Sequence, residues 1–141
     1  MSKFSTYTKT NILQTTLRGV AMPVPAGIFV AMCTADPGDD NTVANEVQAA
    51  AMPAYARINA AGAGTIDTGW SAPANGVSSN AKVVTFAANN GAAAITVTHV
   101  AIYDAANGGN LLYHAPLVTP KTLQPGDVLS FGIGTLNVTL S

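Results

Sequence analysis

The clearest pattern along the chain is an alternation of apolar and polar residues in its second half. KVVTFAA (82–88), AITVTHVAIYDA (94–105) and NLLYHAPLV (110–118) each predict a strand. Successive side chains of a strand point to opposite faces, so this alternation is typical of a sheet with one buried face. The longest of the three runs, residues 94–105, is predicted to cross a whole sheet.

Two further runs near the C-terminus, VLSFGIG (128–134) and TLNVTL (135–140), alternate in the same way. In each run three large apolar side chains share one face: Leu129, Phe131 and Ile133 in the first, and Leu136, Val138 and Leu140 in the second. These runs predict two more strands separated by a Gly-rich stretch.

Turn-forming residues separate the predicted strands. DPGDDN (36–41), NGG (107–109) and PGD (125–127) are dense in residues that tolerate turn conformations. Shorter apolar runs in the first half, GIFVAMC (27–33) and YARIN (55–59), add two strands. Seven or eight short strands with turns every eight to twelve residues predict an all-β, antiparallel sandwich, with a jelly roll favoured over an up-and-down barrel.

The N-terminal residues follow a different pattern. TNILQTTLRG (10–19) has apolar residues at helical spacing, Thr10 as a possible cap and Gly19 as a stop signal, and predicts a short helix. The preceding polar segment has the composition of a terminal arm that becomes ordered only when something holds it. We therefore predict an arm and short helix at residues 1–26, followed by the sandwich at residues 27–141.

Charged residues are scarce, at 9% of the chain against about 25% in ordinary soluble domains. Depletion of Lys and Glu is typical of surface that contacts another protein, which favours a protein that assembles with others. The alternative is a Thr- and Asn-rich β-domain with no such role. A net charge of −1 argues against a nucleic-acid partner, because binding phosphates requires a basic surface.

The few charges are unevenly distributed. Lys3, Lys9 and Arg18 lie in the first eighteen residues, whereas the acidic residues Asp36, Asp39, Asp40 and Glu46 follow. Such a molecule can dock its neighbours head to tail, although a solvated face is the usual interpretation of a charge cluster.

No apolar segment resembles a signal peptide or is long enough to span a bilayer. We therefore expect no membrane partner and synthesis in a reducing cytoplasm. The single cysteine, Cys33, lies in an apolar run and is predicted to be a buried, inert thiol.

No catalytic or metal-binding motif stands out. His99 and His114 lie on the two strands that flank the NGG turn, but zinc requires three or four ligands and no Cys or carboxylate has the matching spacing. Neither histidine is next to a loop rich in acids in the sequence, and no G-x-S-x-G motif is present. We therefore expect half-buried sheet histidines, no cofactor, no metal and no enzymatic activity.

Aromatic residues offer one alternative. Trp70, Tyr55, Tyr103 and Tyr113 are candidates for a sugar-binding face, as in lectin-type jelly rolls. They are scattered along the chain, and we expect them to fill the sandwich instead.

Five segments in this order resemble a widespread family of small tailed-phage virion proteins, often labelled tail-fibre-like. They are TADPGDD, YAR (55–57), HVAIYDA (99–105), GGNLLYH (108–114) and PKTLQPGDVLSFGIGTL. Within this family the chain looks most similar to the jelly-roll cement, or decoration, protein on the capsid of a Bordetella phage. The resemblance covers roughly residues 27–140, and the first twenty-six residues are outside it.

The resemblance implies structural work on the outer capsid surface of a virion. A cement protein bridges neighbouring copies of the major capsid protein, and many copies together stabilise the expanded shell. It also implies a symmetric homo-oligomer. Because few charges protect an exposed sheet edge, we expect a homodimer, and less readily a trimer, that forms through a sheet edge or face. The alternatives are a tail-fibre or receptor-binding module and a carbohydrate-binding or hydrolytic jelly roll.

Specific contacts follow from these expectations. We expect the N-terminal arm to grip the capsid, because it carries cations and isolated aromatics. The residues expected to do so are Lys3, Phe4, Tyr7, Lys9 and Arg18. The acidic loop that contains Asp36, Asp39 and Asp40 is expected to contact a partner.

Overall fold

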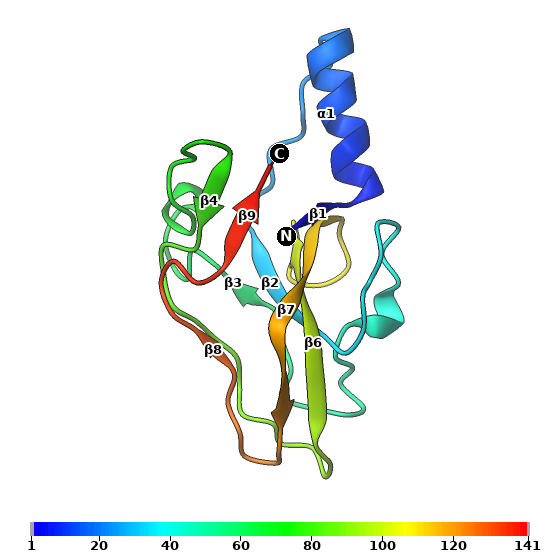
Figure 1. Ribbon diagram of the computed structural model, residues 1–141, viewed down its shortest axis with the longest axis vertical. Coiled ribbons are helices and arrows are strands. Elements are labelled where there is room, and N and C mark those ends of the chain that lie inside the picture. Colours follow the sequence, from blue (N-terminus) through cyan, green and yellow to red (C-terminus); the bar gives the residue numbers. More distant parts are fainter. Residues whose placement is uncertain (1, 141) are drawn as a thin grey trace.

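A computed structural model describes residues 2–140 of the chain. The elements in chain order are β1 (Lys3–Phe4), α1 (Thr6–Arg18), β2 (Phe29–Cys33), η1 (Val43–Asn45), β3 (Ile58–Asn59), η2 (Ile66–Thr68), β4 (Val77–Ser79), β5 (Val84–Thr85), β6 (Ile95–Tyr103), β7 (Leu111–Leu123), β8 (Ser130–Phe131) and β9 (Asn137–Thr139). The chain is mostly antiparallel sheet with a single α-helix in the described part (Figure 1).

A five-stranded sheet forms the centre of the molecule. Its strand order is β1-β7-β6-β2-β3, and every neighbouring pair is antiparallel. The hairpin of β6 and β7 contains the two longest strands, and its turn has Gly108 and Gly109 at φ +60° and +70°. Glycine adopts these left-handed conformations without a steric penalty, so the predicted NGG turn is confirmed.

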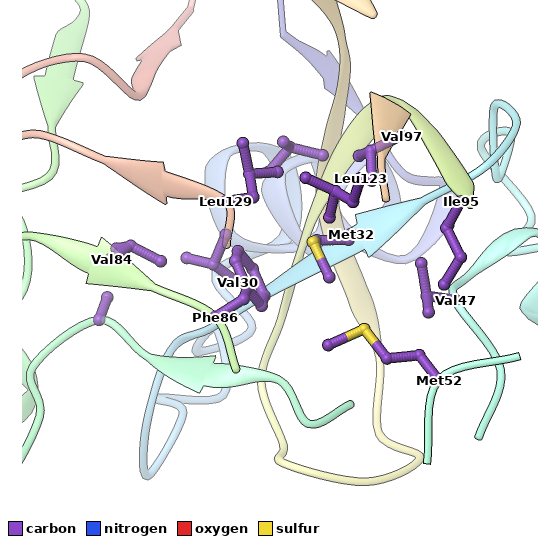
Figure 2. Packing of buried hydrophobic residues seen from close by; sticks show 12 residues of the cluster. Val30, Met32, Val47, Met52, Val84, Phe86, Ile95, Val97, Leu123 and Leu129 are labelled. Carbon is purple, nitrogen blue, oxygen red and sulfur yellow. The ribbon is translucent and has the colours of Figure 1, made fainter. Parts of the chain in front are cut away.

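The remaining strands form two small antiparallel sheets, β4 with β9 and β5 with β8. The main core is a cluster of buried apolar side chains that joins the five-stranded sheet to these shorter strands. Figure 2 shows Val30 and Met32 of β2 gathered with Phe86 and Leu129. The packing of sheet against sheet buries these apolar surfaces and stabilises the fold.

Strand β2 is buried on both faces. Val30 and Met32 belong to the main core, whereas Ala31 and Cys33 belong to a second cluster with Tyr103. A continuous apolar run is typical of a strand buried on both sides. This explains why GIFVAMC lacks the alternation of the later strands.

Helix α1 extends away from the sheets in Figure 1. It begins after Ser5, whose side-chain oxygen accepts a hydrogen bond from the Thr8 N–H (3.1 Å). It ends at Gly19, which has φ +68° and donates its N–H to the Gln14 carbonyl. Both ends therefore carry standard capping interactions.

The predicted all-β, antiparallel fold with one short helix is confirmed. The strands divide into sheets of five, two and two, and the more specific jelly-roll connectivity remains a prediction. The hairpin at residues 94–118 is the best-predicted region, although β7 continues to Leu123.

Three sequence predictions need correction. The helix begins at Thr6 instead of Thr10, because Ser5 supplies the cap. The expected arm contains β1, which pairs with β7 as an edge strand of the central sheet. The C-terminal runs form only the short strands β8 and β9, and Ile133, expected on a shared apolar face, is 66% exposed.

Candidate functional site: helix α1 and its anchoring cluster

The base of α1 is fixed to the central sheet by backbone contacts. In β1, Lys3 lies opposite His114 and Phe4 lies opposite Tyr113. The Ser5 N–H donates to the Leu112 carbonyl (3.1 Å), and the buried Thr8 hydroxyl donates to the same carbonyl (2.9 Å). The first turn of the helix is therefore part of the folded domain.

The acidic loop at residues 36–41 holds the helix from the other side. The Thr6 N–H donates to the Asp39 carbonyl (2.8 Å), and the Thr6 hydroxyl donates to the Asp40 carboxylate (2.7 Å). The Lys9 ammonium forms an ion pair with Asp39. The Lys3 ammonium lies 3.4 Å from the Asp36 carboxylate. The N-terminal cations and the acidic loop therefore contact each other within one chain.

His114 lies between the two aspartates. Its side chain is 1% exposed, with Nε2 2.9 Å from Asp39 Oδ1 and Nδ1 2.8 Å from Asp36 Oδ1. The Nδ1 contact is close but poorly aligned for a hydrogen bond. The second histidine, His99, approaches Asp36 at 3.9 Å and contacts the Thr98 hydroxyl through Nδ1 (2.9 Å). We call Lys3, Lys9, Asp36, Asp39, His99 and His114 the anchoring cluster.

The cluster changes the pKa values of its members. Burial opposes ionisation of Asp36, but the Gly38 N–H and then His114 outweigh it and lower the pKa of this carboxyl. The pKa of Asp39 is also lowered, first by the hydrogen bond from Lys9 and then by that from His114. Burial lowers the pKa of His99, although Asp36 opposes this effect. Both carboxylates are thus stabilised in their ionised form.

The outer part of α1 and the segment after it expose large apolar side chains. These side chains, which we call the apolar strip, are Leu13 (55% exposed), Leu17 (76%), Val20 (49%), Met22 (37%) and Val24 (86%). A groove of about 250 Å³ lies beside the strip, where Tyr7, Pro23 and Leu112 are among its lining residues. Met22 and Val24 also line this groove, and several large apolar side chains exposed along one segment favour a protein interaction site.

The residues predicted to contact a partner have different positions around this surface. Lys3 and Lys9 pair with the acidic loop, and the Phe4 ring packs against Tyr113 at a centroid distance of 5.7 Å. Tyr7 is half-buried beside the groove. Arg18 is exposed near the end of α1, where it donates to the Gln14 side chain (3.2 Å).

The expectation of half-buried histidines is confirmed for His99 but wrong for His114, whose side chain is buried. Neither histidine is next to an acidic loop in the sequence, yet both His99 and His114 contact Asp36 in the fold. Asp36, in the loop after β2, reaches His99 within β6 and His114 within β7, so residues distant in sequence become neighbours. Within residues 2–140, no three His, Cys, Asp or Glu side chains are arranged to hold a metal ion.

A second polar centre, which the sequence analysis missed, lies inside the fold. Arg57 and Glu46 form a bidentate ion pair, Nε to Oε1 at 2.8 Å and Nη2 to Oε2 at 2.8 Å. Their side chains are 6% and 9% exposed. The Arg57 guanidinium also donates to the carbonyls of Ala105 (2.9 Å) and Gly108 (2.7 Å). Arg57, which directly precedes β3, therefore ties this strand to Glu46 and to the β6–β7 turn.

Two tyrosines complete this buried centre. The Tyr55 hydroxyl donates to Glu46 Oε1 (2.7 Å), and the Arg57 guanidinium lies 3.5 Å from the centre of the Tyr103 ring. Burial, followed by Glu46, raises the pKa of both tyrosines. Both tyrosines are thus used inside the fold, as is Trp70, which packs against the main core. The four aromatic candidates therefore do not form one sugar-binding face.

The described helices include none with the length and apolar character needed to cross a membrane.

The fold and its surface define a small all-β module with a projecting helix that exposes Leu13 and Leu17. The chain belongs to a family of bacteriophage virion proteins, as its sequence resemblance implied. The family model, described as "Podophage GP4 fiber I protein gp80", matches residues 3–139. This match supports the virion family but not the closer relationship to the cement protein of a Bordetella phage. Comparison with curated protein sequences gave no significant match.

Proposed function

We propose that the protein is a structural, non-enzymatic module of a phage fibre and that it attaches to its neighbour through the apolar strip on α1. The description of its family, which names a fibre protein, supports the position in the virion. The exposure of Leu13, Leu17 and Val24 supports the surface. The family description favours the fibre role over the capsid role.

Covering the apolar strip contributes favourable free energy to a contact. Fully burying a Leu, Val or Met side chain contributes roughly 1.5–3 kcal/mol. Leu13 is 55% exposed and Leu17 76% exposed, so covering both offers about 2–4 kcal/mol before the costs of association. Several copies in one assembly multiply this modest gain.

The N-terminal segment contributes to attachment mainly through its outer part. Lys3 and Lys9 are matched by Asp36 and Asp39 within the chain, so a new contact through them must replace existing ion pairs. Arg18, at the end of α1, has no carboxylate partner among the described residues. It is the cation best placed to meet an acidic group of a partner.

Self-association through α1 is favoured over association through a sheet edge. Beyond its short pairing with β1, the outer edge of β7 carries Pro116 and Pro120. Proline has no N–H to donate, and within sheets it is confined to edges and bulges. The other edge strand, β3, spans only Ile58–Asn59. Both edges are poor templates for strand pairing, so the proposed dimer or trimer forms through the helix.

A capsid cement protein is the second candidate. The order of the five sequence segments and the charge content of 9% favour this role, in which the partner is the major capsid protein on the outer surface of the shell. Neither candidate requires a cofactor, nucleic acid or membrane.

Copy number in purified virions distinguishes the two candidates. Quantitative mass spectrometry is expected to find this chain at a small fraction of the abundance of the major capsid protein. An abundance comparable to that of the capsid protein contradicts the fibre role and supports the cement role.

A substitution tests the surface itself. A deletion of the whole N-terminal segment, residues 2–18, would also remove β1 and the buried Ser5 and so disturb the fold. The single substitution Leu17→Asp changes only the exposed surface and is therefore the better test. The variant is expected to fold normally but to lose incorporation into virions. Val118→Asp is the matched control, because Val118 is fully exposed on β7. Equal incorporation of wild type and Leu17→Asp overturns the proposal.

A further inference from the structure

His114 is the most deeply buried member of the anchoring cluster, and both of its ring nitrogens face carboxylates. Nε2 lies 2.9 Å from Asp39 Oδ1, and Nδ1 lies 2.8 Å from Asp36 Oδ1. A neutral imidazole has one N–H and one lone pair. With a neutral ring, one of these contacts therefore opposes a lone pair to a carboxylate oxygen. An imidazolium has an N–H on each nitrogen and is attracted to both aspartates.

We infer that His114 is an imidazolium held between Asp36 and Asp39, and that its proton fixes the base of α1 against the central sheet. The inference concerns the positioning of the apolar strip, and only its consequence for assembly rests on the proposed function.

Asp39 connects His114 to the helix. Its carboxylate contacts both His114 and Lys9, and its backbone carbonyl accepts the Thr6 N–H (2.8 Å). On the sheet side, His114 lies opposite Lys3 of β1. Loss of the His114 proton therefore removes the imidazolium contact from one aspartate, which keeps its ion pair with Lys3 or Lys9, and weakens the support of the first helical turn.

The other charged groups around His114 complete its electrostatic surroundings. Lys3 of β1 and Lys9 of α1 face the aspartates, and an ammonium stays charged well above neutral pH. Asp36 and Asp39 have lowered pKa values and remain ionised. His99 of β6, at 3.9 Å from Asp36, has a lowered pKa that favours its neutral form.

His114, Asp36 and Asp39 therefore form a clamp, by which we mean the contact that holds the base of α1 against the central sheet. It is closed when His114 is protonated and both carboxylates are ionised. It opens when His114 loses this proton. Opening frees α1 to change its angle to the sheet, and with it the direction in which Leu13 and Leu17 are presented.

Nitrogen NMR of the histidine rings tests the charge state in the wild-type protein. At about pH 5.5, below the ordinary histidine pKa of about 6.5, both nitrogens of His114 are expected to be protonated. A single protonated nitrogen at this pH overturns the inference, because a neutral ring cannot hold both aspartates.

Hydrogen exchange tests the mechanical effect. Protection of the Ser5 and Thr6 amides, corrected for the intrinsic exchange rate, is expected to fall about tenfold or more between about pH 5.5 and about pH 8.5, as expected for loss of a charged hydrogen bond. In His114→Gln this protection should be low and independent of pH. His99→Gln, the matched control in the same cluster, should keep the wild-type dependence.

If His114→Gln does not fold, the inference is still tested, because the NMR and hydrogen-exchange measurements on the wild-type protein do not depend on this variant. Wild-type protection that is constant across this pH range overturns the clamp. Loss of virion incorporation in Leu17→Asp has no bearing on either result, so failure of the proposed function and failure of the clamp are distinguishable.

Discussion

The buried ion pair between Arg57 and Glu46 offers the sharpest test of how the fold is held together. Arg57→Met removes the guanidinium but keeps a side chain of similar length. It leaves the Glu46 carboxylate, which is 9% exposed, with the Tyr55 hydroxyl as its hydrogen-bond donor. It also removes the two bonds to the Ala105 and Gly108 carbonyls.

The expected loss of stability is large. Removing one partner of a buried ion pair costs about 3–5 kcal/mol, because the remaining charge is left uncompensated. The unfolding entropy of about 2.1 cal/mol/K per residue gives about 0.3 kcal/mol/K for 141 residues. The melting temperature of Arg57→Met should therefore fall by roughly 10–17 °C.

Urea and thermal unfolding measure this effect, and two variants control it. Lys3→Met removes an exposed pair, with side chains 58% and 39% exposed, and should cost less than about 1 kcal/mol. The double variant Glu46→Gln/Arg57→Met should lose less than the sum of the single changes. A loss of unfolding free energy below about 1 kcal/mol in Arg57→Met would contradict this prediction, since an uncompensated buried carboxylate should destabilise the fold by more than that.

The remaining predictions concern titration and reactivity. The lowered pKa values of Asp36 and Asp39 stabilise the fold fully above the ordinary carboxyl value of 3.8, and this contribution is lost as pH falls through the lower folded-state values. In urea titrations the stability of Asp36→Asn should therefore fall less steeply below about pH 4 than that of the wild type; equal slopes would contradict the shift. Burial, and then Glu46, raises the pKa of the Cys33 thiol to about 12, so thiol reagents should label it only after unfolding. Rapid labelling of the native protein would show that this thiol is accessible.

Local patterns predicted the central hairpin because β6 and β7 alternate over a long stretch and are joined by glycines that suit the turn. They also predicted the buried run in β2 and the inert Cys33, which is completely buried. In these regions the local preference and the tertiary environment agree, so short-range reasoning is sufficient.

The C-terminal runs were less well predicted, although their alternation is equally regular. β8 and β9 each pair with one short strand, so only two or three residues of each run find a partner. Alternation indicates which face a residue occupies if a strand forms, but the length of the strand depends on the partner that the fold supplies.

The anchoring cluster and the buried ion pair depend on long-range contacts. Asp39 and His114 are 75 residues apart in sequence, and Glu46 and Arg57 meet only because β2 and β3 are neighbours. The sequence showed the N-terminal cations and the acidic loop as two separate charge clusters, but it did not indicate that the two clusters form ion pairs with each other. Ser5 was missed as a helix cap because the polar residues around it resemble a terminal arm.

The most direct test of the central claim, attachment through the apolar strip, is an electron cryomicroscopy map of the virion that resolves this chain. We expect this map to place the module within a fibre, with Leu13 and Leu17 of α1 covered by a neighbouring protein. A map in which these two side chains face solvent, while another surface of the module makes the contact, would contradict it.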